Sequence, residues 1–315
     1  MRVLITGGAG FIGANLCAYL TGFPGVRAVV ALDDLSTGDA ANLAGTSAEF
    51  VEGSILDRPL VAELVAAADT VVHLAARPSV PMSLADPVAS HEVNASGTLN
   101  VLEACRRNGM HVILASSSSV YGDIAMSPKH EDLATRPLSP YGASKLAAEA
   151  YALAYGTAFE VPVLPLRFFN VYGPLQSAEH AYAAVVPAFV DAALRGEPVT
   201  VFGDGEQTRD FTYVGTVVRV LADAAWRRVV SDTPVNLAYG SRVTVNELAV
   251  MLGEVLGTPL VTRHIAARIG DVRHSQAACE RLTRLFPNVD PVPLADGLKH
   301  TVAWFDRTLN SVGNV

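Results

Sequence analysis

Two residues that could form an acid–base pair stand four positions apart in the sequence, Tyr141 and Lys145. Pro137 and Pro140 precede them and favour a helix that begins here. On a helix, this spacing puts both side chains on one face, one turn apart. An ammonium group beside a phenol stabilises the phenolate, and Lys145 together with a positively charged ring of a bound ligand could lower the pKa of Tyr141 from ~10 toward ~7, where tyrosine acts as a base. Most pairs with this spacing are ordinary surface residues, so the neighbouring motifs decide the interpretation.

A run of four serines, Ser116 to Ser119, follows an apolar stretch that predicts a strand. In open α/β sheets, the carboxyl ends of strands carry the ligand chemistry. A hydroxyl at such an end, as at Ser117, can hydrogen-bond the reacting oxygen of a substrate. The alternative is that the serines cap a turn, and for Ser116, Ser118 and Ser119 this is at least as good an explanation.

A glycine-rich motif lies near the start of the chain, between a predicted strand at 2–6 and a helical pattern. A strand, G-x-x-G-x-x-G and a helix together indicate a dinucleotide site. Glycines at the three motif positions permit a tight turn, close approach of the pyrophosphate and close packing of helix on strand. Asp33 ends the next strand, where a carboxylate accepts the adenosine-ribose hydroxyls and repels a 2′-phosphate, which favours NAD over NADP. The motif residues assigned to the cofactor are Gly7, Gly10, Phe11, Ile12 and Gly13.

The elements that must position these residues follow from alternating apolar runs and helical patterns. Such alternation predicts an α/β fold with a doubly wound parallel (Rossmann) sheet. After about residue 170 the pattern loosens, so we expect an NAD-binding domain over 1–170, to which roughly 210–240 returns, and a smaller C-terminal α/β substrate domain over 171–315. The predicted strands are 2–6, 28–33, 48–52, 69–75, 110–116 and 162–168.

Composition limits the partners and the compartment. Half of the 315 residues are apolar, the mean hydropathy is +0.30, and the net charge is −8 with a pI near 5.5. Without a basic stripe, we expect no nucleic-acid partner. Three widely spaced cysteines, no fitting signal peptide and no run long enough to span a bilayer indicate a cytoplasmic protein with no membrane partner. The eight histidines form no cluster, so no metal is expected.

Together the motifs resemble the extended short-chain dehydrogenase/reductase family, in its nucleotide-sugar epimerase/dehydratase group. The resemblance covers nearly the whole chain, and the order of the motifs is more specific than any one of them. It implies that Ser117 is the catalytic hydroxyl, Tyr141 the base, Lys145 its partner and NAD the cofactor. The motifs are GGAGFIG (7–13), DDLSTG (33–38), HLAA (73–76), SSSSVYG (116–122), YGASK (141–145), RFFNVYGP (167–174), FGDGEQTRDFTYV (202–214) and RIGDVRHS (268–275).

The resemblance also implies the remaining site residues. Besides the motif residues above, the cofactor would contact Ser54, Ile55, Leu74, Ala75, Asn94 and Phe168, as well as Tyr141 and Lys145. A sugar nucleotide would contact Ser117, Asn170, Val185, Phe202, Arg209, Arg268, Asp271 and Ser275. Two positions depart from the family pattern, Ser54 and Gly215, where Asp is common. Neither touches the reacting atoms, so they bear on affinity more than on reaction type.

The implied activity is NAD-dependent 4-epimerisation of a UDP-hexose through a 4-keto intermediate. Family dehydratases carry Asp-Glu or Cys-Glu after the catalytic hydroxyl, and decarboxylases carry Glu, where this chain has Ser118 and Ser119. A dehydratase, a decarboxylase and a non-catalytic NAD-binding regulator remain the alternatives. Ser275 stands where a Tyr would restrict the sugar's C2 substituent. Together with the segment 181–187, it predicts that UDP-GlcNAc/UDP-GalNAc are accepted, with UDP-Glc/UDP-Gal as further substrates.

Two helical stretches, at 94–107 and 141–155, have apolar faces. Members of the family dimerise through such helices, so a homodimer is expected. Burial of the same faces inside one subunit is the alternative.

Overall fold

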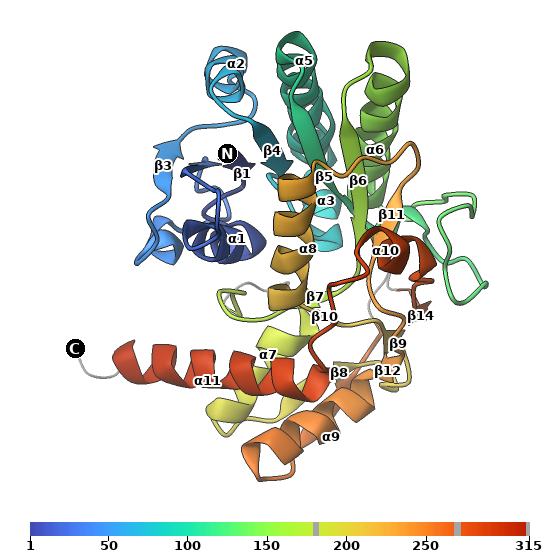
Figure 1. The fold of residues 1–315 in the computed structure, drawn as a ribbon. Helices are drawn as coiled ribbons and strands as arrows, with labels where there is room; N and C mark the ends of the chain where they lie inside the picture. Colours follow the sequence, from blue (N-terminus) through green and yellow to red (C-terminus); the bar gives the residue numbers. More distant parts are fainter. Residues whose placement is uncertain (179–182, 268–271, 313–315) are drawn as a thin grey trace.

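The centre of the molecule is a seven-stranded parallel sheet. The computed structural model describes residues 1–178, 183–267 and 272–312. Within them the strand order is β11-β6-β5-β4-β1-β2-β3, and every neighbouring pair is parallel. The order runs outward in both directions from the β1/β4 pair, which is the reversal point where doubly wound sheets bind ligands (Figure 1). The predicted fold class is confirmed.

The inner strands are short runs of apolar and β-branched residues that are buried on both faces, as parallel sheets require, whereas the edge strand β3 begins and ends with an exposed glutamate. Two of them differ from the prediction. The strand predicted over 69–75 ends at His73, because Leu74 and Ala75 leave the sheet, and the seventh strand, β11, lay outside the predicted set. The strands are β1 (Arg2–Thr6), β2 (Ala28–Asp33), β3 (Glu49–Glu52), β4 (Thr70–His73), β5 (His111–Ser117), β6 (Val163–Phe168) and β11 (Val235–Leu237).

Helices cover both faces of this sheet and form two separate apolar cores (Figure 1). One face carries α1 (Phe11–Thr21), α8 (Val214–Arg227) and α10 (Glu280–Leu285). The other carries α2 (Arg58–Ala66), α5 (Thr98–Asn108) and α6 (Pro140–Phe159). Because α8 packs on α1 and β11 pairs with β6, residues 214–237 rejoin the sheet after the chain has left it.

Short helices line the carboxyl edge of the sheet. After β4 the chain forms α3 (Val80–Ala85), α4 (Pro87–His91) and one turn of π-helix, η2 (Glu92–Gly97), that runs directly into α5. Single π-helical turns are rare and occur often at functional sites. Two 3₁₀ turns, η1 (Ala40–Leu43) and η3 (Ser118–Val120), follow β2 and β5.

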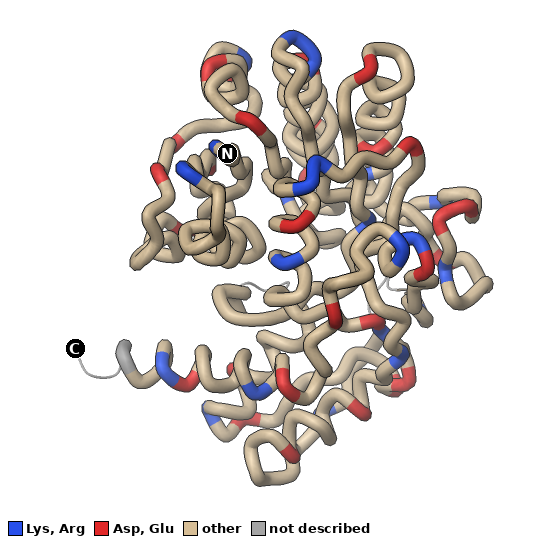
Figure 2. The backbone as a smooth tube through the Cα atoms, in the orientation of Figure 1, with Lys and Arg blue, Asp and Glu red and all other residues tan. Residues whose placement is uncertain are grey.

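The remaining elements form a smaller lower half with its own core, built around Phe189, Val199 and Leu248 (Figure 1). Its helices are α7 (Val185–Leu194), α9 (Val245–Leu256) and α11 (Leu294–Val312). Its strands are β7 (Val171–Tyr172), β8 (Val199–Phe202), β9 (Thr208–Arg209), β10 (Thr212–Tyr213), β12 (Val243–Thr244), β13 (Thr262–Ile265) and β14 (His274–Ser275). Positively and negatively charged residues are interspersed along the chain in both halves (Figure 2). Among the described residues, no helix is both long and apolar enough to cross a bilayer.

Candidate active site

The glycine motif forms a tight turn that brings α1 close to the end of β1. Gly7 has a φ of +70°, a conformation that glycine adopts without strain, and a Cβ there would lie 2.7 Å from the backbone nitrogen of Ala75. A Cβ at Gly13 would collide with the carbonyl oxygen of Gly7. The first turn of α1, from Phe11 on, therefore begins directly at the sheet edge. Backbone N–H groups at such a helix start fit a pyrophosphate.

Asp33 lies at the end of β2, beside this turn. Its carboxylate is 8% exposed and accepts hydrogen bonds from the backbone nitrogens of Ala9 (3.0 Å) and Leu35 (2.9 Å). Burial raises its pKa. It borders a small hollow together with Gly7, Ile55 and Ala75, the arrangement that the ribose of a dinucleotide requires.

Two other residues predicted for the cofactor make contacts within the protein. The Ser54 hydroxyl accepts a hydrogen bond from the backbone nitrogen of Leu56 at 3.2 Å. Asn94 is buried in the π-helical turn, and its amide accepts from the backbone nitrogen of Arg77 (2.8 Å) and donates to the Ser144 hydroxyl (3.0 Å). Asn94 thus holds the loop after β4 against the catalytic helix.

The helix α6 carries Tyr141 in its first turn and Lys145 one turn later. Ser139 caps the helix by accepting from the backbone nitrogen of Gly142 at 3.1 Å, and proline occupies the first helical position, as predicted. A Cβ at Gly142 would lie 2.8 Å from the carbonyl oxygen of Ser119, so only a glycine lets α6 approach the end of β5 this closely. That approach brings Tyr141 within hydrogen-bond reach of Ser117.

The charges of this group differ from the sequence-based expectation. Burial raises the pKa of Tyr141, and the hydrogen bond with Ser117 offsets this only in part. Lys145 donates to the carbonyl oxygen of Ala115 at 2.9 Å, and burial lowers its pKa to about 8. In this structure the Lys145 ammonium is bonded to Ala115, and burial dominates the pKa of Tyr141. Activation of the phenol needs further positive charge, which a bound nicotinamide ring carries.

Alternating serines of β5 point to opposite sides. Ser117 faces the catalytic helix start, and its hydroxyl caps η3 by accepting from the backbone nitrogen of Ser119 at 3.1 Å. Ser116 faces away and donates to Glu149 of α6 at 2.6 Å. Glu149 forms a bidentate, buried ion pair with Arg167 of β6, at 2.6 and 2.9 Å. Ser116 is therefore part of a buried network and not a turn cap.

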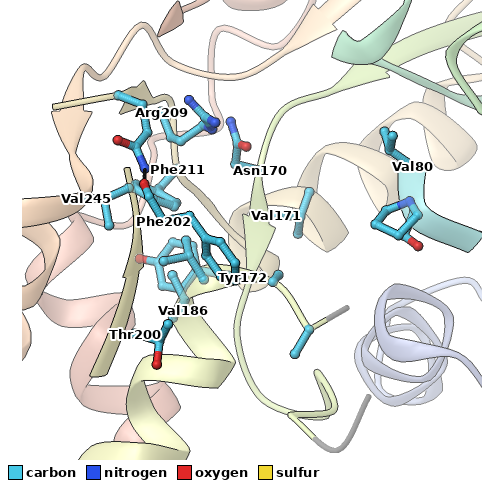
Figure 3. Close-up of a pocket in the computed structure, with 16 residues that line it drawn as sticks. Val80, Asn170, Val171, Tyr172, Val186, Thr200, Phe202, Arg209, Phe211 and Val245 are labelled. Atoms are coloured by element: carbon cyan, nitrogen blue, oxygen red, sulfur yellow. Dashed lines mark hydrogen bonds between the residues drawn. The ribbon is translucent and has the colours of Figure 1, made fainter. Parts of the chain in front are cut away.

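A cavity of about 370 Å³ lies between the chain that follows β6 and the elements of the lower half (Figure 3). Four predicted substrate residues line it: Asn170, Val185, Phe202 and Arg209. Asn170 and Arg209 lie next to each other, Phe202 lies below them in this view, and Val80 lies on the opposite side of the cavity (Figure 3). Phe168, predicted beside the nicotinamide, is the register partner of Ser117 on the neighbouring strand.

Two predicted substrate residues that the structure describes, Ser117 and Ser275, are not among the residues that line this cavity. Ser275 is 4% exposed on β14, where it is the register partner of Arg209. Arg268 and Asp271 lie outside the described residues, as do positions 181 and 182 of the segment used to predict the sugar.

The structure adds lining residues that sequence reasoning missed. Tyr172 and Phe211 pack edge to face at the cavity wall, and the Gln207 amide donates to the carbonyl oxygen of Phe202 at 2.8 Å. All three residues belong to the motifs RFFNVYGP and FGDGEQTRDFTYV named above, but the motifs assign no role to these positions. Pattern alone does not reveal which alternate side chains of a short strand face a cavity.

Asp210 is another missed residue, with a supporting role. It is fully buried and accepts from the backbone nitrogens of Gly240 (3.0 Å), Ser241 (3.1 Å) and Ala277 (3.1 Å). It thereby fixes two chain segments, 240–241 and the one around Ala277, beside the strand that carries Arg209.

A dinucleotide turn beside a Ser–Tyr–Lys group on a doubly wound sheet defines a nucleotide-dependent enzyme of the short-chain dehydrogenase/reductase type. The chain belongs to the NAD dependent epimerase/dehydratase family, which matches residues 3–238. The resemblance inferred from the motifs is confirmed, and NAD is the cofactor.

The similarity to other proteins covers nearly the whole chain. A UDP-glucose 4-epimerase of Mycolicibacterium smegmatis is 36% identical over 312 residues, covering 97% of this chain and 98% of the relative. The solved UDP-N-acetylglucosamine 4-epimerase from Methanobrevibacter ruminantium, in complex with UDP-N-acetylmuramic acid, is 32% identical with a TM-score of 0.91 over 98% of both chains. The UDP-glucose 4-epimerase of Thermus thermophilus, solved in complex with NAD, is 34% identical with a TM-score of 0.88, covering 97% of this chain and 99% of that one.

Proposed function

We propose that this protein is a UDP-hexose 4-epimerase that works through a 4-keto sugar. The observation that carries the proposal is the hydrogen bond between Tyr141, at the start of α6, and Ser117, whose register partner Phe168 lies two residues before Asn170 of the 370 Å³ cavity. A sugar held in that cavity would present a hydroxyl to Tyr141. The similarity to 4-epimerases over the full chain length supports the same reaction.

Proton handling falls to this chain's own residues. Tyr141 takes the proton of the sugar's C4 hydroxyl, Ser117 hydrogen-bonds the same oxygen, and Lys145 supplies positive charge near the phenolate. When bound, NAD would supply a reversible acceptor for the C4 hydride. Turning of the 4-keto sugar within the cavity exposes its other face, and Tyr141 then gives the proton back. The cofactor is unchanged over one cycle, so we expect it to stay bound.

Polar side chains of the cavity wall anchor the nucleotide in this proposal. The Arg209 guanidinium and the Asn170 amide lie together there, and a guanidinium fork suits a diphosphate. Phe202 and Val185 supply apolar surface for the base. Arg268 and Asp271 complete this proposal by resemblance to the family.

The sugar specificity that we propose depends on Ser275. Ser275 lies beside Arg209 in register, and a small side chain there leaves space for an acetamido group. UDP-GlcNAc and UDP-GalNAc are then interconverted, and UDP-Glc and UDP-Gal are accepted as well. Ser275→Tyr should lower kcat/KM for the acetylated pair by about tenfold or more, while the plain hexoses change little. Equal loss for both pairs would contradict this assignment.

One experiment tests the reaction type. Purified protein is incubated with UDP-Glc, UDP-Gal, UDP-GlcNAc, UDP-GalNAc and UDP-glucuronic acid, and the products are identified by NMR. Epimers at C4 are expected. Release of CO₂ or loss of water would indicate a decarboxylase or a dehydratase, although Ser118 and Ser119 provide no carboxyl group for those reactions. Binding of NAD without any turnover would indicate a regulator.

We also propose that the protein is a homodimer that pairs through α5 and α6. Leu102 of α5 is buried inside the subunit, but Tyr151 and Phe159 of α6 and Val88 of α4 are exposed. Light scattering after size exclusion should give twice the chain mass. Replacement of Tyr151 and Val88 by aspartate should give a folded monomer.

A further inference from the structure

His73 is a buried histidine with a hydroxyl partner on each side. It is the last residue of β4 and is 2% exposed. Its Nδ1 lies 2.6 Å from the Thr6 hydroxyl of β1, and its Nε2 lies 2.9 Å from the Thr98 hydroxyl at the start of α5. Thr6 and His73 are register partners on the two strands between which the sheet order reverses. The ring therefore joins β1, β4 and α5 at the ligand-binding edge.

The hydrogen bonds of Thr98 determine which group donates and which accepts on each side of the His73 ring. The Thr98 hydroxyl has one proton and donates it to the carbonyl oxygen of Asn94 at 2.7 Å. The ring must then donate from Nε2 to Thr98 and accept at Nδ1 from Thr6. Burial, with a smaller effect of the Lys145 charge, lowers the pKa of His73 to about 3, so the ring is neutral with one proton. The Thr6 oxygen in turn accepts from the backbone nitrogen of Ala75 at 3.3 Å.

This series of hydrogen bonds continues to α6, the helix that carries Tyr141. The Asn94 amide donates to the Ser144 hydroxyl at 3.0 Å, and that hydroxyl donates to the carbonyl oxygen of Tyr141 at 2.9 Å. A continuous path therefore runs from Ala75, whose backbone adjoins the dinucleotide turn, to the backbone of the base. Each hydroxyl on this path donates its single proton to one defined acceptor.

We propose that His73, in its Nε2–H tautomer, is a positioning residue that holds the loop after β4 in register with Tyr141. The proposal rests on the proposed function, in which the cofactor and the sugar must lie at a fixed distance for hydride transfer. Reacting atoms must come within about 3–3.5 Å, and a misplacement of about 1 Å can cost ~100-fold in rate. The His73 ring accepts a hydrogen bond from β1 and donates one to α5. By joining β4 to these two elements, it sets the distance between the cofactor and the sugar.

Four variants separate positioning from simple stability. His73→Phe keeps the ring shape and removes both nitrogens, whereas His73→Gln retains one acceptor and one donor. Thr98→Val removes the acceptor of the ring proton with little change in volume. His111→Phe is the matched control, because His111 is also buried, starts the neighbouring β5 opposite Thr70, and bonds the carbonyl oxygen of Val229 at 2.8 Å, away from the path.

We expect His73→Phe and Thr98→Val to lower kcat about tenfold or more, with KM within about threefold. His73→Phe should also weaken binding of NAD, measured by calorimetry. His73→Gln should stay within about threefold of the wild type, and His111→Phe should keep its kcat even where its melting temperature falls as far. Equal kcat values for His73→Phe and His111→Phe would overturn the proposal.

Nitrogen-15 NMR of the histidine rings tests the tautomer without any substrate. The signal lost in His73→Gln should show a protonated Nε2 and an unprotonated Nδ1. A charged ring or a protonated Nδ1 would overturn the proposal. If the wild type epimerises no UDP-sugar, the proposed function fails, while the tautomer and the difference in NAD affinity between His73→Phe and His111→Phe still test the positioning role.

Discussion

In the proposed mechanism, the phenol of Tyr141 exchanges a proton with a sugar hydroxyl beside Ser117. Tyr141→Phe should lower kcat by at least ~100-fold, the low end of general acid–base contributions, with little change in the affinity for NAD. Product NMR and calorimetry with NAD measure the two effects. Turnover close to that of the wild type would remove Tyr141 from the proposed mechanism.

Asp33 should make the protein prefer NAD to NADP. Its buried carboxylate repels a 2′-phosphate at the end of β2, and both of its oxygens already hold backbone N–H groups, so the side chain cannot swing away. We expect at least ~10-fold tighter binding of NAD in a competition titration. Equal affinities would show that the ribose lies elsewhere.

At the scale of elements, the buried Glu149–Arg167 pair joins the catalytic helix α6 to β6. Glu149→Ala leaves the Arg167 guanidinium buried without a counter-charge, which typically costs about 3–5 kcal/mol. Chemical denaturation should show this loss. Glu103→Ala, which removes an ion pair with Arg106 and Arg107 at the surface of α5, is the control and should change stability far less. Similar losses in both variants would mean that the buried pair contributes no more than a surface one.

The sequence predicts some elements of the fold and the site better than others. Six strands and the glycine turn follow from the sequence because buried parallel strands and dinucleotide turns have strong local signals. The three-residue strand β11 has none, because its position depends on pairing with β6. The Tyr141–Lys145 spacing was predicted, but the raised pKa of Tyr141 was not, because burial depends on the packing of α6 against β5. The role of His73 depends likewise on Thr6 and Thr98, which are distant in sequence.

At the scale of the whole molecule, two buried histidines should make the fold sensitive to mild acid. Burial lowers the pKa of His73 to about 3 and that of His111 to about 4, from 6.5. The unfolded chain therefore takes up protons below pH ~6.5 that the folded chain does not, and stability is lost as the pH falls. The slope should approach about 2.7 kcal/mol per pH unit near pH ~5, which corresponds to the uptake of both protons.

Urea denaturation between pH ~7 and pH ~5 measures that slope. In His111→Phe the slope should fall to about half, because His73 alone of this pair remains. An unchanged slope would show that other groups cause the acid sensitivity.

The return of residues 214–237 to the sheet has a consequence for biosynthesis. While the chain leaves the ribosome, the apolar side of α1 stays uncovered until α8 has emerged, and the edge of β6 stays unpaired until β11 follows. Uncovered apolar surface and open strand edges promote aggregation. A fragment that ends near residue 170 would lack both elements, so we expect it to be a poor stand-alone dinucleotide module that aggregates when it is expressed alone.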